Sequence, residues 1–429
     1  MIFFKNIFSK QNNITLKNEL FSGIVNYLTC AYIAVINPMI LAEANIPESD
    51  VFLATCITIG CICFFMAFRT NLPIIIGPTS SINTYFLAGI VGNLGLSWQE
   101  GLSATFLSGI IILLLSHLNL RKKINLAIPQ SLTDAIIFGI GIFLLIISLK
   151  ISGIFIIGDN FSLDFINLVT FATAVAASLI LDKFKVPGSS VIGIFLATVI
   201  YQIFSSTHIT NLVTIPSGFK QSLFALNLAN CFHAKNLAAT FAMTVIVLLD
   251  SNASLNAITK KIDKNNNSSC SKPFEGIGAA TILGSLLGTS SSGVFLECLS
   301  GVKAGGKTGI STLVTGILFL FTLFLSPLIH IIPNSATTAV LFLISISIIS
   351  HHSFFKSLNI SELIPAIITI VIIPIQFSIA DGIGAGIISY SLIHILKRDW
   401  IKFNPYLIGI NTLFCCFFIT KYIISNGFF

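Results

Sequence analysis

Apolar runs of about 20 residues recur along the whole chain and are separated by short polar or Gly- and Pro-containing stretches. A helix needs about 20 mainly apolar residues to cross the hydrocarbon core of a bilayer. On this criterion the pattern predicts spans at 22–42, 51–68, 72–92, 98–118, 133–149, 165–181, 186–204, 236–258, 275–288, 289–302, 309–329, 336–350, 361–377 and 381–396. A further apolar run at 405–424 fits either another span or an interfacial helix. We therefore expect an all-α polytopic membrane protein with about 14 transmembrane segments.

Composition narrows the class of protein further. Charged residues make up 9% of the chain, against about 25% in ordinary soluble domains, and the mean hydropathy is +0.95. So few charges cannot cover a soluble fold of 429 residues, which excludes soluble, disordered and collagenous classes. The net charge of +7 does not indicate nucleic-acid binding, because the basic residues are spread along the chain at segment ends.

The basic residues also orient the spans, because Lys and Arg favour cytoplasmic loops. With the N-terminus inside, 19 of them fall on the cytoplasmic side, three (Lys150, Lys220 and Lys235) fall outside, and Lys421 lies in the terminal run. We therefore expect a multi-pass protein of the cell (inner) membrane with both termini cytoplasmic. No targeting peptide is expected, and residues 1–18 are predicted to lie along the cytoplasmic membrane surface.

Fourteen spans divide into two sets of seven, and an odd number of spans per half forces the halves into opposite orientations. We predict a first repeat at 19–204, an external linker at 205–235, a second repeat at 236–398 and a C-terminal tail with the extra apolar segment at 399–429. Related small and polar stretches, Gly77–Ser81 and Gly288–Ser292, lie in the third and tenth spans at an offset of 211 residues. The fourth and eleventh spans share that offset, which supports an inverted repeat.

The Gly/Ser/Thr stretches predict short extended breaks in the third and tenth spans. A break exposes backbone groups inside the bilayer and is tolerated only where protein or a polar cavity satisfies them. We expect a half-helix to start at each Ser/Thr cluster, whose hydroxyls cap its free N–H groups, and both N-termini to face a shared midplane site. The alternative is a pair of Ser-rich kinks that serve close packing.

Two acidic residues, Asp250 and Glu297, lie inside predicted spans. A charged side chain in hydrocarbon costs about 2.5–3.5 kcal/mol on insertion scales and usually faces a cavity or a partner. The sequence offers no Lys or Arg at membrane depth to pair with either acid, so each favours holding a proton and could couple substrate binding to proton uptake. The alternative is a permanently protonated structural acid.

Other polar and aromatic side chains accompany these acids in the same spans. The candidate substrate contacts are Asn83, Asp250, Glu297, Ser81, Ser251, Ser254, Thr289, Ser290 and Phe86, with Glu297 and Asp250 also the candidates for proton coupling. Carboxyls, an amide and hydroxyls beside aromatic rings suit a flat neutral heterocycle, whereas a strongly anionic substrate would be repelled.

The remaining polar residues suggest structural roles. Asn37-Pro38 is expected to kink the first span, and Asp134 and Asp381 are expected to cap helix starts. The His and Cys residues form no cluster with metal-ligand spacing, and no phosphate-binding loop or nucleophile motif is present. We expect no cofactor, no metal and no catalytic residue, hence a transporter rather than an enzyme.

At these residues the sequence resembles the nucleobase–cation symporter family (the xanthine/uracil permease group), specifically its adenine/guanine/hypoxanthine permease branch. The likeness is carried by Tyr32–Pro38, Asn71–Pro73, Asn83, Ser97–Gln99, Gly288–Ser290, Glu297, Gly301-Val302, Gly305–Gly309, Phe324, Ser326 and Pro327. The resemblance implies a core domain of spans one to four and eight to eleven and a gate domain of the other spans. It also implies that Asn83, Asp250 and Glu297 contact a purine base, which is imported with a proton by relative movement of core and gate.

Three alternatives stay open on the sequence. One is a transporter of the same fold for another substrate (xanthine, uracil or a small anion), a second is a membrane-embedded enzyme that uses Asp250 and Glu297 as an acid–base pair, and a third is a channel. The sequence also leaves open sodium in place of the proton, and whether the protein forms a homodimer.

Overall fold

The computed structural model describes residues 15–118, 128–156, 162–205, 218–262, 272–327, 331–350, 359–397 and 405–425. The first half comprises α2 (Leu16–Cys30), α3 (Ile33–Ala42), α4 (Glu48–Thr70), β1 (Ile76–Pro78), α5 (Ser80–Tyr85), the π-helix η1 (Phe86–Asn93), α6 (Trp98–His117), α8 (Gln130–Ile151), β2 (Phe155–Ile156), β3 (Ser162–Leu163), α9 (Phe165–Lys183) and α10 (Ser189–Ser205). The second half comprises η2 (Leu228–Asn230), α11 (Ala234–Ile262), α12 (Lys272–Leu287), β4 (Ser292–Val294), α13 (Cys298–Lys303), α14 (Gly309–Thr322), η3 (Leu323–Leu325), α16 (Asn334–Ser350), α17 (Ile360–Ile375), α18 (Ile379–Leu396) and α19 (Pro405–Ser425).

These elements account for the fourteen predicted spans. The first span is α2 and α3 together, and the third and tenth spans are the broken segments β1–α5–η1 and β4–α13. Seven helical segments in the described part of the chain, one of which is α2 and α3 together, are long and apolar enough to cross a membrane. The prediction of an all-α polytopic protein with breaks in the third and tenth segments is therefore confirmed.

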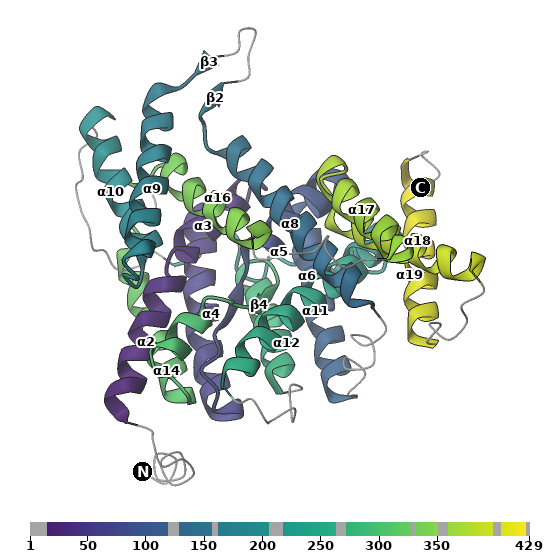
Figure 1. Cartoon of the computed structure of the whole chain (residues 1–429), viewed down its shortest axis with the longest axis horizontal. Coiled ribbons are helices and arrows are strands. Elements are labelled where there is room, and N and C mark those ends of the chain that lie inside the picture. The colour runs from purple at the N-terminus through teal and green to yellow at the C-terminus, as the bar shows by residue number, and fades with distance from the viewer. Residues whose placement is uncertain are drawn as a thin grey trace.

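The helices pack in two sets, which we call the core and the gate. In the core, α6 packs most extensively on α12, and α4 on α14; in the gate, α17 packs on α18, α9 on α10, and α8 on α16. Figure 1 shows α9 and α10 on one flank and α17, α18 and α19 on the other, with core helices between them. The predicted core and gate are thus both present.

The packing repeats itself with inverted order. The second span of the first half, α4, packs on the fourth span of the second half, α14; conversely, the fourth span α6 packs on α12, the second span of the second half. Likewise α9 on α10 in the first half corresponds to α17 on α18 in the second. This reciprocity is what two halves related by a twofold axis require.

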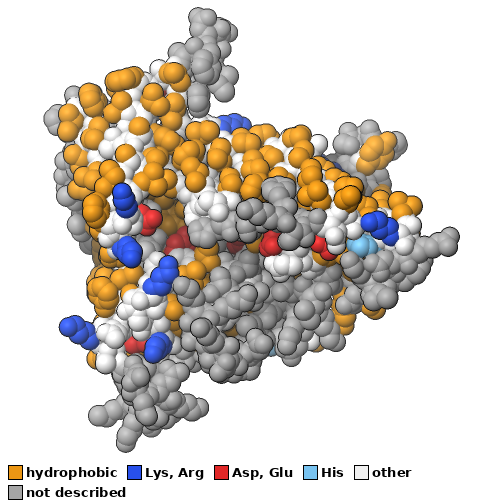
Figure 2. All heavy atoms as spheres, viewed as in Figure 1, with side chains coloured by type: hydrophobic (Ala, Val, Ile, Leu, Met, Phe, Trp, Pro, Cys, Tyr) orange, Lys and Arg blue, Asp and Glu red, His pale blue; other side chains and the backbone are white. Residues whose placement is uncertain are grey.

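The outer surface is apolar, as a bilayer requires. Figure 2 shows one face on which hydrophobic side chains cover most of the described helices and charged ones are few. Exposed large side chains include Phe68, Leu114, Phe195, Ile203 and Phe321. A water-soluble protein would not leave so many large apolar side chains exposed to solvent.

Two expected helix caps are absent. At α18 the cap is Ser378, whose side chain accepts from the backbone N–H of Asp381, while the Asp381 carboxylate accepts from Lys421 of α19. Asp134 accepts from Gln130 Nε2 at 2.8 Å within α8. The capping predictions for Asp381 and Asp134 are therefore wrong, because both residues lie inside their helices, after the caps Ser378 and Pro129, and their carboxylates bond to side chains instead.

Candidate functional site

The two broken spans meet through a pair of short strands at the centre of the core. β1 and β4 run antiparallel, and Gly77 lies opposite Gly293. The Phe295 N–H donates to the Ile75 carbonyl oxygen at 3.1 Å, just beyond the strands. The strand pair thus supplies backbone hydrogen bonds that helix geometry cannot supply at these breaks, as the interior of a bilayer demands.

Glycine at position 293 lets the α11 helix approach this joint closely. A Cβ atom built there would lie 3.2 Å from Thr79 Cγ2 and 3.3 Å from both Asp250 Oδ2 and Ser251 Oγ. Such contacts are tighter than side chains ordinarily make. Because Gly293 has no side chain, the Asp250 carboxylate of α11 can lie directly beside β4.

The half-helices begin differently from the prediction. α5 begins at Ser80, but the Thr79 side chain makes no capping hydrogen bond and lies 3.4 Å from Ser81 Oγ. In the tenth span, Gly288–Ser292 leads into β4, and α13 begins only at Cys298. The start of a half-helix at the first Ser/Thr cluster is therefore confirmed, but its capping by a cluster hydroxyl is not. For the second cluster the expectation is wrong, because these residues contribute to packing and to the strand instead.

A closed hydrogen-bond network joins the two broken spans to the first two spans. Asn37 Nδ2 donates to Thr55 Oγ1 at 2.6 Å and to Thr289 Oγ1 at 2.8 Å, and Asn37 Oδ1 accepts from Asn83 Nδ2 at 2.5 Å. The Ser290 hydroxyl donates to Asn83 Oδ1. All five side chains are fully buried, so both polar atoms of Asn83 are already engaged by protein. We call this set the Asn37 network.

The two acids lie near the strand pair and keep part of their surface exposed. Asp250 comes from α11 and accepts from Ser81 Oγ at 3.4 Å. Glu297 immediately precedes α13 and accepts from the Tyr32 hydroxyl. The two carboxyls are close enough to interact electrostatically. In the described ranges the ion pairs are Arg69–Glu275 and Lys421–Asp381, so no cation there neutralises either acid.

The remaining candidates differ in where they lie. Ser251 is buried against Gly293, and its hydroxyl has no hydrogen-bond partner among the described residues. Ser254, about one turn beyond Asp250 on α11, is also buried. Phe86 is fully buried with its ring against Gly101 of α6. The structure thus brings Ser81 and Ser251 next to Asp250 and packs the Phe86 ring on α6.

Sequence reasoning missed two residues of this region, Asn37 and Tyr32. The Asn37-Pro38 pair predicts a helix kink, yet Asn37 is the residue that the Asn37 network shares. Tyr32 contacts one of the two acids from the first span. Asn37 is the one polar residue in the otherwise apolar run Ile33–Ala42. A single amide in such a run is the signal that could have marked it.

Comparison with known proteins decides the family. A sequence model described as a permease family matches residues 17–384. The chain belongs to this permease family. Its members are transporters, so the expectation that the chain is not an enzyme is confirmed, as is the resemblance seen in the sequence.

Individual relatives agree with the family, and a solved structure shares the fold. Adenine permease AdeQ of Escherichia coli is 29% identical over 94% of this chain and 93% of its own length. Guanine/hypoxanthine permease PbuO of Bacillus subtilis is 28% identical over 94% and 98%. Nucleobase transporter PlAzg2 of Paenibacillus larvae is 32% identical over 88% and 77%. The transmembrane domain of the cyanobacterial bicarbonate transporter BicA shares the fold, with a TM-score of 0.69 and 16% identity over 86% of this chain and 97% of that one.

Proposed function

We propose that this permease carries purine nucleobases across the cell membrane in symport with a proton. The observation that carries the proposal is that two carboxyls, Asp250 and Glu297, each accept a hydrogen bond beside the strand joint, from Ser81 and Tyr32, and that neither has a described cation to pair with it. The names of the relatives, which include adenine and guanine/hypoxanthine permeases, agree with a purine base as substrate.

The chemistry of the site suits this substrate. Purine bases are flat and neutral and carry ring N–H groups, for which carboxyl oxygens are good acceptors. Asp250 and Glu297 are the proposed acceptors, with the Ser81, Ser251 and Ser254 hydroxyls as further contacts. A small anion would meet two acidic groups that no described cation pairs with, so anion transport is disfavoured.

We assign the other candidates supporting roles. Because both polar atoms of Asn83 are engaged, we propose that Asn83, Thr289 and Ser290 hold the broken spans in register rather than read the base. Phe86 would support α5 from the side of α6.

Proton coupling follows from the same two acids. A carboxyl without a cationic partner in a low dielectric favours its protonated form, so one of the two acids can take up a proton together with the substrate. Glu297 is the proposed coupling residue, and Tyr32 orients it. Transport would proceed by movement of the core against the gate, with the N-terminus cytoplasmic and the repeats 19–204 and 236–398 joined by an external linker at 205–235.

The test is uptake of labelled adenine, guanine and hypoxanthine into proteoliposomes, with and without an inward proton gradient. We expect gradient-dependent accumulation of at least one base, loss of accumulation in Glu297→Gln and weaker binding in Asp250→Asn. Glu43→Gln, which changes an exposed acid, is the matched control and should behave as the unaltered protein. Undiminished uphill uptake by Glu297→Gln would remove its coupling role, and no uptake of any purine by folded protein would reject the substrate.

A further inference from the structure

The helix α19 lies outside the seven-plus-seven repeat and beyond the residues matched by the family model, which end at 384. It has 21 residues, and Lys421 is its one charged residue. At about 1.5 Å per residue such a helix is about 31 Å long, which matches the hydrocarbon core of a bilayer. The sequence alone left open whether this run spans the membrane or lies at its surface.

Two polar contacts attach α19 to the gate helix α18. Lys421 pairs with Asp381, and Asn411 Nδ2 donates to Ser391 Oγ at 2.7 Å. Asn411 and Lys421 lie ten residues apart along α19. Their partners on α18, Ser391 and Asp381, also lie ten residues apart but in the reverse order along the chain. The two helices therefore run in opposite directions, and α19 re-crosses the depth that α18 crosses.

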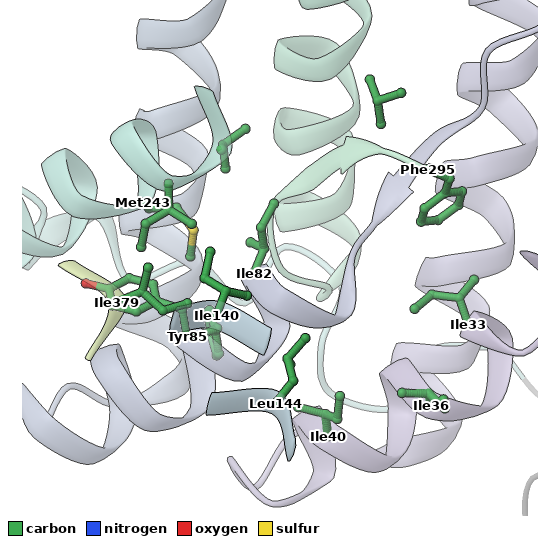
Figure 3. Close-up of a cluster of buried hydrophobic side chains, with 14 of the residues drawn as sticks. Ile33, Ile36, Ile40, Ile82, Tyr85, Ile140, Leu144, Met243, Phe295 and Ile379 are labelled. Carbon is green, nitrogen blue, oxygen red and sulfur yellow. The ribbon is translucent and has the colours of Figure 1, made fainter. Parts of the chain in front are cut away.

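The ion pair gives this attachment its strength. The Asp381 side chain is 5% exposed, and a buried acid of this kind needs a partner. Asp381 is also close enough to Tyr85 of α5 to interact electrostatically. Figure 3 shows buried side chains of this region, among them Tyr85 from α5, Met243 from α11 and Ile379 from α18. Lys421 therefore neutralises an acid where the gate meets the core.

On another side α19 meets the core helix α11 through aromatic rings. The rings of Phe241 and Phe414 are 5.0 Å apart at 71°, and those of Phe241 and Phe417 are 6.4 Å apart. Separating two aromatic rings leaves no unpaired charge, whereas separating Lys421 from the buried Asp381 would, so the ring contacts are the ones that can exchange during a sliding movement. α11 is also the helix that carries Asp250.

We propose that α19 is a fifteenth membrane-spanning helix that belongs to the gate, moves as one unit with α18, and offers its aromatic face as the surface along which α11 slides during transport. The part concerning movement rests on the proposed function. The membrane-spanning assignment of α19 is independent of the proposed function. A fifteenth span places the C-terminus on the opposite side of the membrane from the N-terminus.

Paired cysteines test the movement. In a background with the exposed thiols Cys61, Cys415 and Cys416 replaced by serine, Phe241→Cys with Phe414→Cys links α19 to the core. The matched pair Ser391→Cys with Asn411→Cys links α19 to the gate. We expect oxidation to stop purine uptake in the first pair, with recovery on reduction, and to leave uptake intact in the second. Equal sensitivity of both pairs, or loss only in the second, would overturn the assignment of α19 to the gate.

Epitope tags at the two termini test the span without any transport measurement. In spheroplasts we expect one tag to be reached by antibody from outside and the other only after permeabilisation. Tags on the same side would reject the fifteenth span. If uptake is absent before oxidation in every variant and in the unaltered protein, the proposed function fails while the tag result still decides the topology.

Discussion

Replacing Asn37 by alanine is expected to destabilise the core, because this amide is the residue that the Asn37 network shares. The substitution removes both donor bonds to Thr55 and Thr289 and the acceptor for Asn83. The Asn83 amide nitrogen then lies in a fully buried position without its acceptor.

The magnitude follows from these bonds. Interhelical hydrogen bonds in membrane proteins average about 0.6 kcal/mol, so the three bonds lost contribute about 2 kcal/mol. A buried donor left without an acceptor costs about 1–3 kcal/mol more. We therefore expect Asn37→Ala to lower the free energy of unfolding by about 3–5 kcal/mol.

The assay is unfolding in mixed micelles by titration with SDS, read as a free energy. Thr105→Val is the matched control, because the Thr105 hydroxyl is equally buried but bonds only to the Gly101 carbonyl of its own helix at 2.9 Å. The double variant Asn37→Ala with Asn83→Ala should lose less than the sum of the two single losses. Additive losses, or an effect of Asn37→Ala no larger than that of the control, would refute the network.

Three further substitutions probe the site and its surroundings. Gly293→Ala would place a Cβ 3.3 Å from the α11 carboxylate, and we expect weaker substrate binding with the fold retained, measured by ligand-induced thermal stabilisation. Tyr32→Phe removes the hydroxyl that donates to Glu297; a hydrogen bond to a charged group is worth about 1.5–3 kcal/mol, so uptake should fall about tenfold or more. Tyr27→Phe, which removes a hydroxyl outside the site, should leave uptake unchanged. Asp50→Asn weakens an acceptor shared by three backbone N–H groups, and the segment around residues 220–222 should become sensitive to external protease.

The span pattern could be predicted from sequence because burial in a bilayer is a local property of 20 consecutive residues. The same holds for the breaks, since Gly77-Pro78 cannot continue a helix at membrane depth. The cost of placing a charge in hydrocarbon likewise predicts polar neighbours for Asp250 and Glu297, and Ser81 and Tyr32 are such neighbours.

Partners far apart in sequence could not be predicted in this way. Local rules favour a short acid at a helix start and so predict that Asp381 caps its helix, yet its partner is Lys421 on another helix. Asn37 was assigned to a kink because Pro38 follows it, yet its three partners lie on three other segments. Hydrophobic periodicity describes which face is buried and carries no information on which polar groups meet there.

The pairing of β1 with β4 also has a consequence for how the protein is made. Ile76 pairs with Val294, so 294 − 76 = 218 residues separate the two partners. At about 5–20 residues per second, a ribosome needs about 10–40 s to synthesise the second after the first. During that interval the third span has no strand partner, and its backbone groups cannot rest in lipid unsatisfied. The third span must therefore wait in the translocon or against other proteins until the tenth is made, and assembly of the two halves, rather than insertion of single helices, completes the membrane-embedded chain.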